Sequence, residues 1–132
     1  MKWDVDFHDD FVSEYRKLPE DVQDELLAAV RLLEQFGPRL ARPHVDTLNG
    51  SRHHNMKEVR FDAEGGVWRF AFAFDTKRRG ILLCGGDKSG GGGKRFYLQL
   101  IDKADTRYDA HLARIKEQEK KQKKGKDHEK HR

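Results

Sequence analysis

The chain has 132 residues, of which 36% are hydrophobic and 38% are charged, and its formal net charge is +4 at pH 7. A chain of this length can bury one modest core but not two. No apolar run approaches the roughly 20 residues that a membrane-spanning helix needs, and no signal-peptide pattern follows Met1. Cys84 is the only cysteine, which excludes an internal disulfide and fits a reducing compartment. These features predict a single cytoplasmic domain that does not associate with membranes.

Charge is unevenly distributed along the sequence. Residues 1–36 hold four basic and ten acidic groups, residues 37–115 hold fifteen and nine, and residues 116–132 hold eight and four. Chance can produce such segregation of charge. The segregation is also what we expect of a protein with one surface suited to a polyanion and another surface that repels a polyanion.

The first third of the chain has one strand pattern and two helix patterns. Trp3, Val5 and Phe7 alternate with polar residues, which is typical of a short half-buried strand. Helical spacing follows from residue 11 to residue 18, and again from residue 22 to residue 33, before a Gly-Pro pair ends the second helix. Both predicted helices have acidic outer faces.

Strand spacing begins after a predicted loop over residues 39–55. Residues 57–62 and 67–74 alternate with a period of two, and residues 81–84 return from a basic turn as a hairpin. In the second of these strands, four aromatic residues share the face that we expect to pack on the helices. The opposite face then presents Arg60 and Arg69 above small alanines, with no covering element expected.

The last predicted element is a C-terminal helix, because apolar residues recur every three or four positions from Tyr97 to Ile115. Beyond it there is no hydrophobic anchor, so residues 117–132 are predicted to form a disordered charged tail. The predicted fold is α+β. Two N-terminal helices pack on a small, mainly antiparallel twisted sheet, and a C-terminal helix completes a domain over residues 1–116.

The stretch GGDKSGGGGK, residues 85–94, superficially resembles a nucleotide-binding loop. A Walker A loop needs G-x-x-x-x-G-K followed by Ser or Thr, but Lys94 is followed by Arg95, and Lys88 stands where the first glycine belongs. The G-x-G-x-x-G pattern fails at the same arginine. The glycines therefore either let the backbone approach an RNA phosphate, with Lys88 at the edge, or form an ordinary flexible connection.

Conventional metal and hydrolase signatures do not account for the remaining polar residues. His53 and His54 are adjacent and lack Cys or carboxylate partners at zinc spacing. No serine lies in a G-x-S-x-G sequence, and Cys84 lies in an apolar run. The sequence therefore predicts neither a metal nor a cofactor.

A group of basic residues is the remaining candidate for chemistry. RNA is cleaved when a 2′-hydroxyl attacks the adjacent phosphate while the developing charge is neutralised. Arginines bind phosphate oxygens through two parallel hydrogen bonds, and Tyr, Lys or Asp can transfer the protons. The group comprises Lys57, Arg60, Arg69, Lys88 and Lys94, with Tyr97 close by in sequence.

Several sequence blocks match a known family. They are Gly37-Pro38 with residues 40–43, KEVR at residues 57–60, Trp68-Arg69-Phe70, and Gly85-Gly86-Asp87-Lys88 followed by Tyr97, Ile101, Ala104-Asp105, Tyr108 and His111-Leu112. In these blocks the chain resembles the RelE/ParE toxin superfamily, and within it the HigB-like, phage-associated toxins. The resemblance spans about residues 3–116, and the last block is its most specific part.

The resemblance implies a toxin of a type II toxin-antitoxin system that cleaves mRNA on the ribosome and inhibits translation without a metal. It also implies a helix-turn-helix antitoxin as partner. By this resemblance Arg60 and Arg69 would stabilise the scissile phosphate, Lys88 would hold RNA beside them, and Asp87 or Tyr97 would assist proton transfer. The other expected RNA contacts are Lys57, Lys94, Arg95, Arg78 and Arg79.

Two other functions stay open at this point. The ParE branch of the superfamily inhibits DNA gyrase without cutting RNA, so inhibition of a protein target is one alternative. Relatives often carry bulky aromatic residues after the Gly-Asp-Lys block, whereas four glycines, residues 90–93, stand here. Together with the basic tail, these glycines suggest the other alternative, a non-toxic module that binds an antitoxin or nucleic acid.

Overall fold

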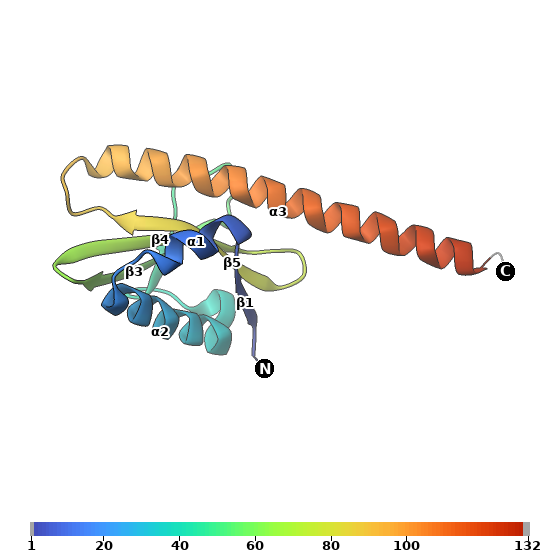
Figure 1. Ribbon diagram of the computed structural model, residues 1–132, viewed down its shortest axis with the longest axis horizontal. Helices are drawn as coiled ribbons and strands as arrows, with labels where there is room; N and C mark the ends of the chain where they lie inside the picture. The colour runs from blue at the N-terminus through green and yellow to red at the C-terminus, as the bar shows by residue number, and fades with distance from the viewer. Residues whose placement is uncertain (1, 131–132) are drawn as a thin grey trace.

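The computed structural model describes residues 2–130, with side chains as far as residue 123, and places a five-stranded sheet between two helical layers (Figure 1). No helix within this part of the chain has an apolar stretch long enough to cross a membrane. The elements in chain order are β1 (Asp4–Phe7), α1 (Asp9–Arg16), α2 (Glu20–Phe36), the short 3-10 helix η1 (Gly37–Arg39), β2 (Val45–Thr47), β3 (Lys57–Ala63), β4 (Gly66–Phe74), β5 (Arg79–Asp87) and α3 (Gly93–Lys130).

The sheet is mixed and mainly antiparallel, which confirms the predicted α+β class. Its strand order is β1-β5-β4-β3-β2. Only β1 runs parallel to its neighbour, β5, and the remaining pairs are antiparallel. The central strand β4 has apolar side chains on both faces, Phe70 and Phe72 on one and Ala71 and Ala73 on the other, so both faces must be covered to keep them from water.

The first face of the sheet packs against α1 and α2, as predicted. Phe70 and Phe72 of β4 are fully buried there, and Phe11 of α1 contacts the Phe70 ring at a centroid distance of 5.9 Å. Leu26 and Leu33 of α2 belong to the same cluster. The alternating aromatic residues of β4 therefore supply the main core.

The prediction that the second face lacks a cover is wrong. Ala71 and Ala73 of β4 are buried against Leu100, Ala104 and Tyr108 of α3, in a second apolar cluster that also contains Ile81, Leu83 and Cys84 of β5. Small alanines leave room for a helix to lie close to the sheet, so they mark a helix-packing face. Burial against α3 raises the pKa of the Cys84 thiol to about 12, which leaves it a protonated core residue.

Two strand boundaries also differ from the sequence prediction. The predicted loop over residues 39–55 contains β2, a strand of three residues with only Val45 buried, too short to show a periodic pattern. Strand β5 continues through Gly85 and Gly86 to Asp87, so the first two glycines of the glycine-rich stretch belong to the sheet. The exposed turn that follows uses the left-handed conformation at Gly91 and Gly92, with φ of 83° and 70°.

Helix α3 continues beyond the domain as a single helix to Lys130 (Figure 1). This projecting part covers most of the segment predicted to be a disordered tail, and residues 131–132 lie outside the described residues. Residues 116–123 are exposed. One ion pair, between Lys77 and Glu119 at 3.1 Å, links this stretch to the β4–β5 turn.

We predict that Gly85→Ala destabilises the domain by about 3 kcal/mol, the upper end of the usual cost of overpacking a core. A Cβ at this position would lie 2.0 Å from Cδ1 of Phe70, a ring that is itself fully buried and stacked on Phe61. The matched control is Gly90→Ala in the same glycine-rich stretch, where a Cβ would meet no atom within 4 Å. Urea denaturation of the two variants should show a large loss for the first and none for the second, and equal midpoints would contradict the packing described.

Candidate active site

The two arginines of the predicted site lie directly opposite each other on neighbouring strands. Arg60 of β3 pairs with Arg69 of β4 in the strand register. Their side chains share the face of the sheet that α3 covers, near the first turns of that helix. Arg69 is buried at 6% exposure, whereas the Arg60 side chain is 22% exposed. Two like charges opposed in this way repel each other, so the arrangement requires a compensating anion.

Glu58 supplies this compensation from the same face of β3. Its side chain is only 4% exposed. The Oε1 atom accepts a hydrogen bond from Nη1 of Arg60 at 2.9 Å, and Nε of Arg69 lies 3.3 Å from the same oxygen. The Arg69 Nε makes no hydrogen bond in the described part of the chain, so this contact is an ion pair. The three side chains together carry one net positive charge.

Tyr97 completes this group from the first turns of α3. Its hydroxyl donates to Oε1 of Glu58 at 2.9 Å, and burial, followed by this hydrogen bond, raises the pKa of the phenol. The ammonium group of Lys88 lies over the Tyr97 ring, 5.4 Å from its centroid. Strands β3 and β4, the end of β5 and the start of α3 therefore bring four predicted residues together, namely Arg60, Arg69, Lys88 and Tyr97.

A cavity of about 280 Å³ adjoins this group. The cavity gives solutes direct access to Arg60 and Tyr97, whereas Arg69 is buried. Its wall also includes residues that the sequence did not single out, because the loop before β3 has no periodicity and Glu58 reads as an ordinary surface partner of arginine. The lining residues are Asp46, Thr47, Leu48, Asn49, Glu58, Arg60 and Tyr97.

The structure places Asp87 and Lys57 away from the arginine pair, which corrects their grouping in the sequence analysis. Asp87 pairs with Trp68 in the register, so it faces the α1–α2 layer. Its carboxylate accepts from the backbone N–H groups of Ser89 and Val67, and its contacts to Ser89 hold its pKa below the usual range. Lys57 shares the face of Val59 and donates to the Pro38 carbonyl at 2.9 Å.

The other expected RNA contacts divide between the two ends of the sheet. Lys94 and Arg95 are exposed in the first turn of α3, one turn before Tyr97. Their charges add to the positive potential of that helix end. Arg78 and Arg79 lie at the β4–β5 turn, where the Arg78 guanidinium stacks 4.4 Å from the Trp3 ring centroid. Arg69 pairs with Gly86 of β5, and Arg79 lies seven residues before Gly86 on the same strand. At the usual rise per strand residue this separation is roughly 23 Å.

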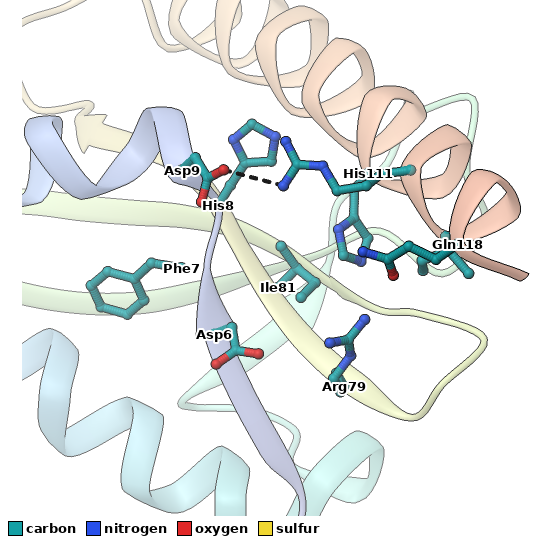
Figure 2. A pocket seen from close by; sticks show the side chains of 10 residues that line it. Asp6, Phe7, His8, Asp9, Arg79, Ile81, His111 and Gln118 are labelled. Carbon is teal, nitrogen blue, oxygen red and sulfur yellow. Dashed lines mark hydrogen bonds and ion pairs between the residues drawn. The ribbon is translucent and has the colours of Figure 1, made fainter. Parts of the chain in front are cut away.

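A larger cavity, of about 370 Å³, lies at this distant end (Figure 2). Figure 2 shows Asp6 of β1, His8 at the start of α1 and Arg79 of β5 around it, together with His111 and Gln118 of α3. His111 is already bonded to the buried carboxylate of Asp75 at 2.8 Å. Asp9 pairs with Arg114 at 3.1 Å, as the dashed line marks. Because His111 and Arg114 in this cavity are already bonded to Asp75 and Asp9, the smaller cavity beside the arginine pair is the better candidate for chemistry.

The architecture is that of the RelE toxins. A mutant of Escherichia coli toxin RelE in its free state superposes with a TM-score of 0.54 at 15% sequence identity, over 75% of this chain and 97% of that one. A chain of the archaeal RelE–RelB complex from Pyrococcus horikoshii gives a TM-score of 0.50 at 20% identity, over 69% of this chain and 100% of that one. At these identities the similarity establishes the fold alone.

The family described as phage-derived protein Gp49-like (DUF891) matches residues 13–109, and the chain belongs to this family. It is 47% identical over 96 residues to the putative toxin HigB3 of Mycobacterium tuberculosis, covering 73% of this chain and 82% of that protein. It is 39% identical over 110 residues to the putative toxin HigB2 of the same organism. That match covers 83% of this chain but only about half, 54%, of HigB2. The predicted resemblance to HigB-like, phage-associated toxins is thereby confirmed.

We predict that Glu58→Gln lowers the free energy of unfolding by about 3 kcal/mol, because removing one partner of a buried ion pair leaves uncompensated buried charge. The exposed α2 residue Glu25 provides the control Glu25→Gln, which should change little. Replacing Arg69 with Met in the Glu58→Gln background should recover part of the loss, since it removes the unpaired cation. Urea denaturation at pH 7 measures all four proteins. Equal stability of Glu58→Gln and the parent would show that Glu58 does not balance the arginines.

Proposed function

We propose that this protein is the toxin of a type II toxin-antitoxin system and that it cleaves mRNA on the ribosome, which inhibits translation. The observation that carries the proposal is the opposed pair Arg60 and Arg69, with one net positive charge in excess, beside a cavity that a nucleotide can enter. Similarity to proteins named as putative HigB toxins supports the toxin part of the proposal. The positive charge in excess within the Glu58–Arg60–Arg69 group, next to an Asp46 that is itself paired with Arg42, supports an RNA phosphate as the group bound there.

The two arginines have different tasks in this proposal. Arg60 lines the cavity, and its guanidinium binds the scissile phosphate directly. Arg69 has one amino group committed to the Trp68 carbonyl at 2.8 Å and its Nε beside Glu58. It therefore holds the Glu58–Arg60 pair in place and contributes positive charge from beneath. Fixed charges of this kind stabilise the pentavalent phosphorane without reorganising during the reaction.

Proton transfer requires an acceptor for the 2′-hydroxyl and a donor for the 5′-oxygen. The 2′-oxygen forms a bond to phosphorus while the bond from phosphorus to the 5′-oxygen breaks, which leaves a 2′,3′-cyclic phosphate and a 5′-hydroxyl end. Glu58 is buried and its Oε1 already accepts hydrogen bonds from Arg60 and Tyr97. We therefore assign the acceptor role to the more exposed Asp46, although its carboxylate also accepts from Arg42 and from the N–H of Thr47, contacts that lower its pKa. That residue lines the cavity, and its side chain is 35% exposed.

Tyr97 is the proposed proton donor in place of Asp87. Because its pKa is raised, the phenol stays protonated at neutral pH, and the 5′-alkoxide that leaves is far more basic than a phenolate. Lys88 lies against the Tyr97 ring and would offset negative charge at the leaving oxygen. No step needs a metal ion or a cofactor.

The partners follow from the same proposal. A cognate helix-turn-helix antitoxin would bind the toxin, which is consistent with the solved RelE–RelB complex among proteins of this fold. The ribosome would present the mRNA, and the protein would therefore act in the cytoplasm. Lys94 and Arg95, exposed at the start of α3, would contact phosphates next to the one that is cut.

We predict that Arg60→Ala lowers the rate of mRNA cleavage by about 100-fold or more, the typical loss when one fixed donor to a developing charge is removed. Mapping of mRNA 5′ ends after brief induction in cells measures the cuts. Arg31→Ala, at an exposed position on α2, is the matched control and should cut like the parent.

The same experiment separates the alternatives. Growth arrest with intact transcripts would replace the nuclease with an inhibitor of a protein target. Neither arrest nor cuts would indicate a non-toxic binding module. Equal cutting by Arg60→Ala and the parent would remove the arginine pair from the chemistry.

A further inference from the structure

Helix α3 continues well past the part of the chain whose helical structure the core explains. Among the side chains described up to residue 123, the last buried one on this helix is Ile115. The family match ends at residue 109, yet the helix runs on to Lys130 (Figure 1). Residues 116–130, which we call the projecting helix, contain no hydrophobic residue. Packing against the domain therefore cannot be the purpose of this segment.

The direction of the projecting helix is set by its connection to the domain. It continues the part of α3 that lies buried on the sheet. Just before it, Arg114 pairs with Asp9 at the start of α1, and within it Glu119 pairs with Lys77 of the β4–β5 turn, each at 3.1 Å. Exposed pairs of this kind are weak individually, but they come from two different elements. The projecting helix is thus presented to solvent in one orientation.

Three lysines form a stripe along one face of the projecting helix. Lys116, Lys120 and Lys123 are exposed, and their spacings of four and three residues place them on the same side of the helix. Like charges four residues apart slightly destabilise a helix, so helix stability does not explain the lysine stripe. A ligand that supplies negative charge would explain it.

The acidic residues of this segment do not cancel the lysine stripe. Glu119 is paired with Lys77 of the domain. Glu117 precedes Lys121 by four residues, the order in which a glutamate and a lysine on one helix attract each other best. Residues 116–123 hold four lysines and two glutamates, which leaves a net charge of +2. The lysine stripe therefore remains a positive surface suited to a polyanion.

The position and composition of the projecting helix narrow the choice of polyanion. Lys116 is nineteen residues beyond Tyr97 on α3, or roughly 28 Å at the helical rise, so it cannot bind the phosphate beside Arg60. Residues 116–130 contain no Phe, Tyr or Trp, whereas proteins that hold single strands stack bases on aromatic rings. Lysines alone bind phosphates without reading bases. Double-helical RNA is recognised in this manner, by shape and backbone.

We propose that the lysine stripe binds the phosphate backbone of double-helical RNA, at a surface separate from the candidate active site. The inference rests on the proposed function, because a protein that cuts mRNA on the ribosome is surrounded by double-helical RNA. The projecting helix supplies affinity there, and the chemistry stays with Arg60 and its neighbours.

The test measures binding of the full chain to a labelled RNA duplex of roughly 16 base pairs, the span of a dedicated duplex-binding domain. The test variant carries Lys116→Gln, Lys120→Gln and Lys123→Gln, since glutamine removes charge but favours helix as lysine does. The matched control carries Arg16→Gln, Lys17→Gln and Arg31→Gln, which remove the same charge from exposed positions on and between α1 and α2. Circular dichroism checks that both variants keep the helix content of the parent.

We expect the lysine variant to bind the duplex about tenfold more weakly than the parent. Its plot of log affinity against log salt should be shallower by about 3, one unit for each lost phosphate contact. The control should match the parent in both respects. An unchanged lysine variant, or an equal loss in the control, would overturn the lysine stripe as a binding surface. Tighter binding of the parent to a DNA duplex of the same sequence would overturn RNA as its ligand.

Sedimentation with ribosomes and mapping of mRNA 5′ ends separate this inference from the nuclease. We expect less of the lysine variant than of the control to sediment with ribosomes. Duplex binding that depends on the lysines, in a protein that makes no cuts, would keep the inference and reject the nuclease. Cuts by a protein whose duplex binding does not depend on the lysines would keep the nuclease and reject the inference.

Discussion

The candidate site depends on one buried carboxylate placed between two opposed arginines. The antiparallel register puts Arg60 opposite Arg69, an arrangement that would repel itself without Glu58 at the same face. Because Glu58 neutralises only one of the two charges, the group is stable in the absence of a ligand and still attracts an anion. Tyr97 binds the same oxygen, so the start of α3 is fixed to the strands through this carboxylate. The cavity, Tyr97 and the half-buried Arg60 therefore keep their relative positions because of Glu58.

The second constraint is the strict alternation along β4. Its aromatic residues need one helical layer, and Ala71 and Ala73 on the other face need a second one. Helix α3 meets the second need, and in doing so it brings Tyr97 over the strands. The same helix separates two polar regions, since the Asp75–His111 contact and the larger cavity lie at the far end of the sheet. The far end thus holds the His111–Asp75 and Arg114–Asp9 pairs, and the near end holds the two arginines that share Glu58.

Much of the fold could be predicted from local patterns. The alternation over β3 and β4, the apolar stripe of α2 and the recurrence from Tyr97 onward all correspond to elements at the predicted places. The errors have physical causes. Strand β2 is too short to produce a period, and the small residues Ala71 and Ala73 look like an open face until the helix that covers them is known. Gly85 looks like part of a loop although its missing Cβ makes room for Phe70.

The sequence by itself determined the residue types of the site and the family, because Arg60, Arg69, Lys88 and Tyr97 lie in recognisable local blocks. Only the tertiary structure decided which of the charged residues meet. Spacing along a strand gives the face but not the register, so it could not show that Glu58 lies between the arginines. Spacing also could not show that Asp87 faces the other layer through its pairing with Trp68. Asp46 and Asn49 carry no periodic signal. Asp46 reaches the cavity because β2 pairs it with Glu58, and Asn49 because Leu48 and Gly50 on either side pack toward α3. Contacts between distant segments depend on how those segments pack, and no local pattern contains that information.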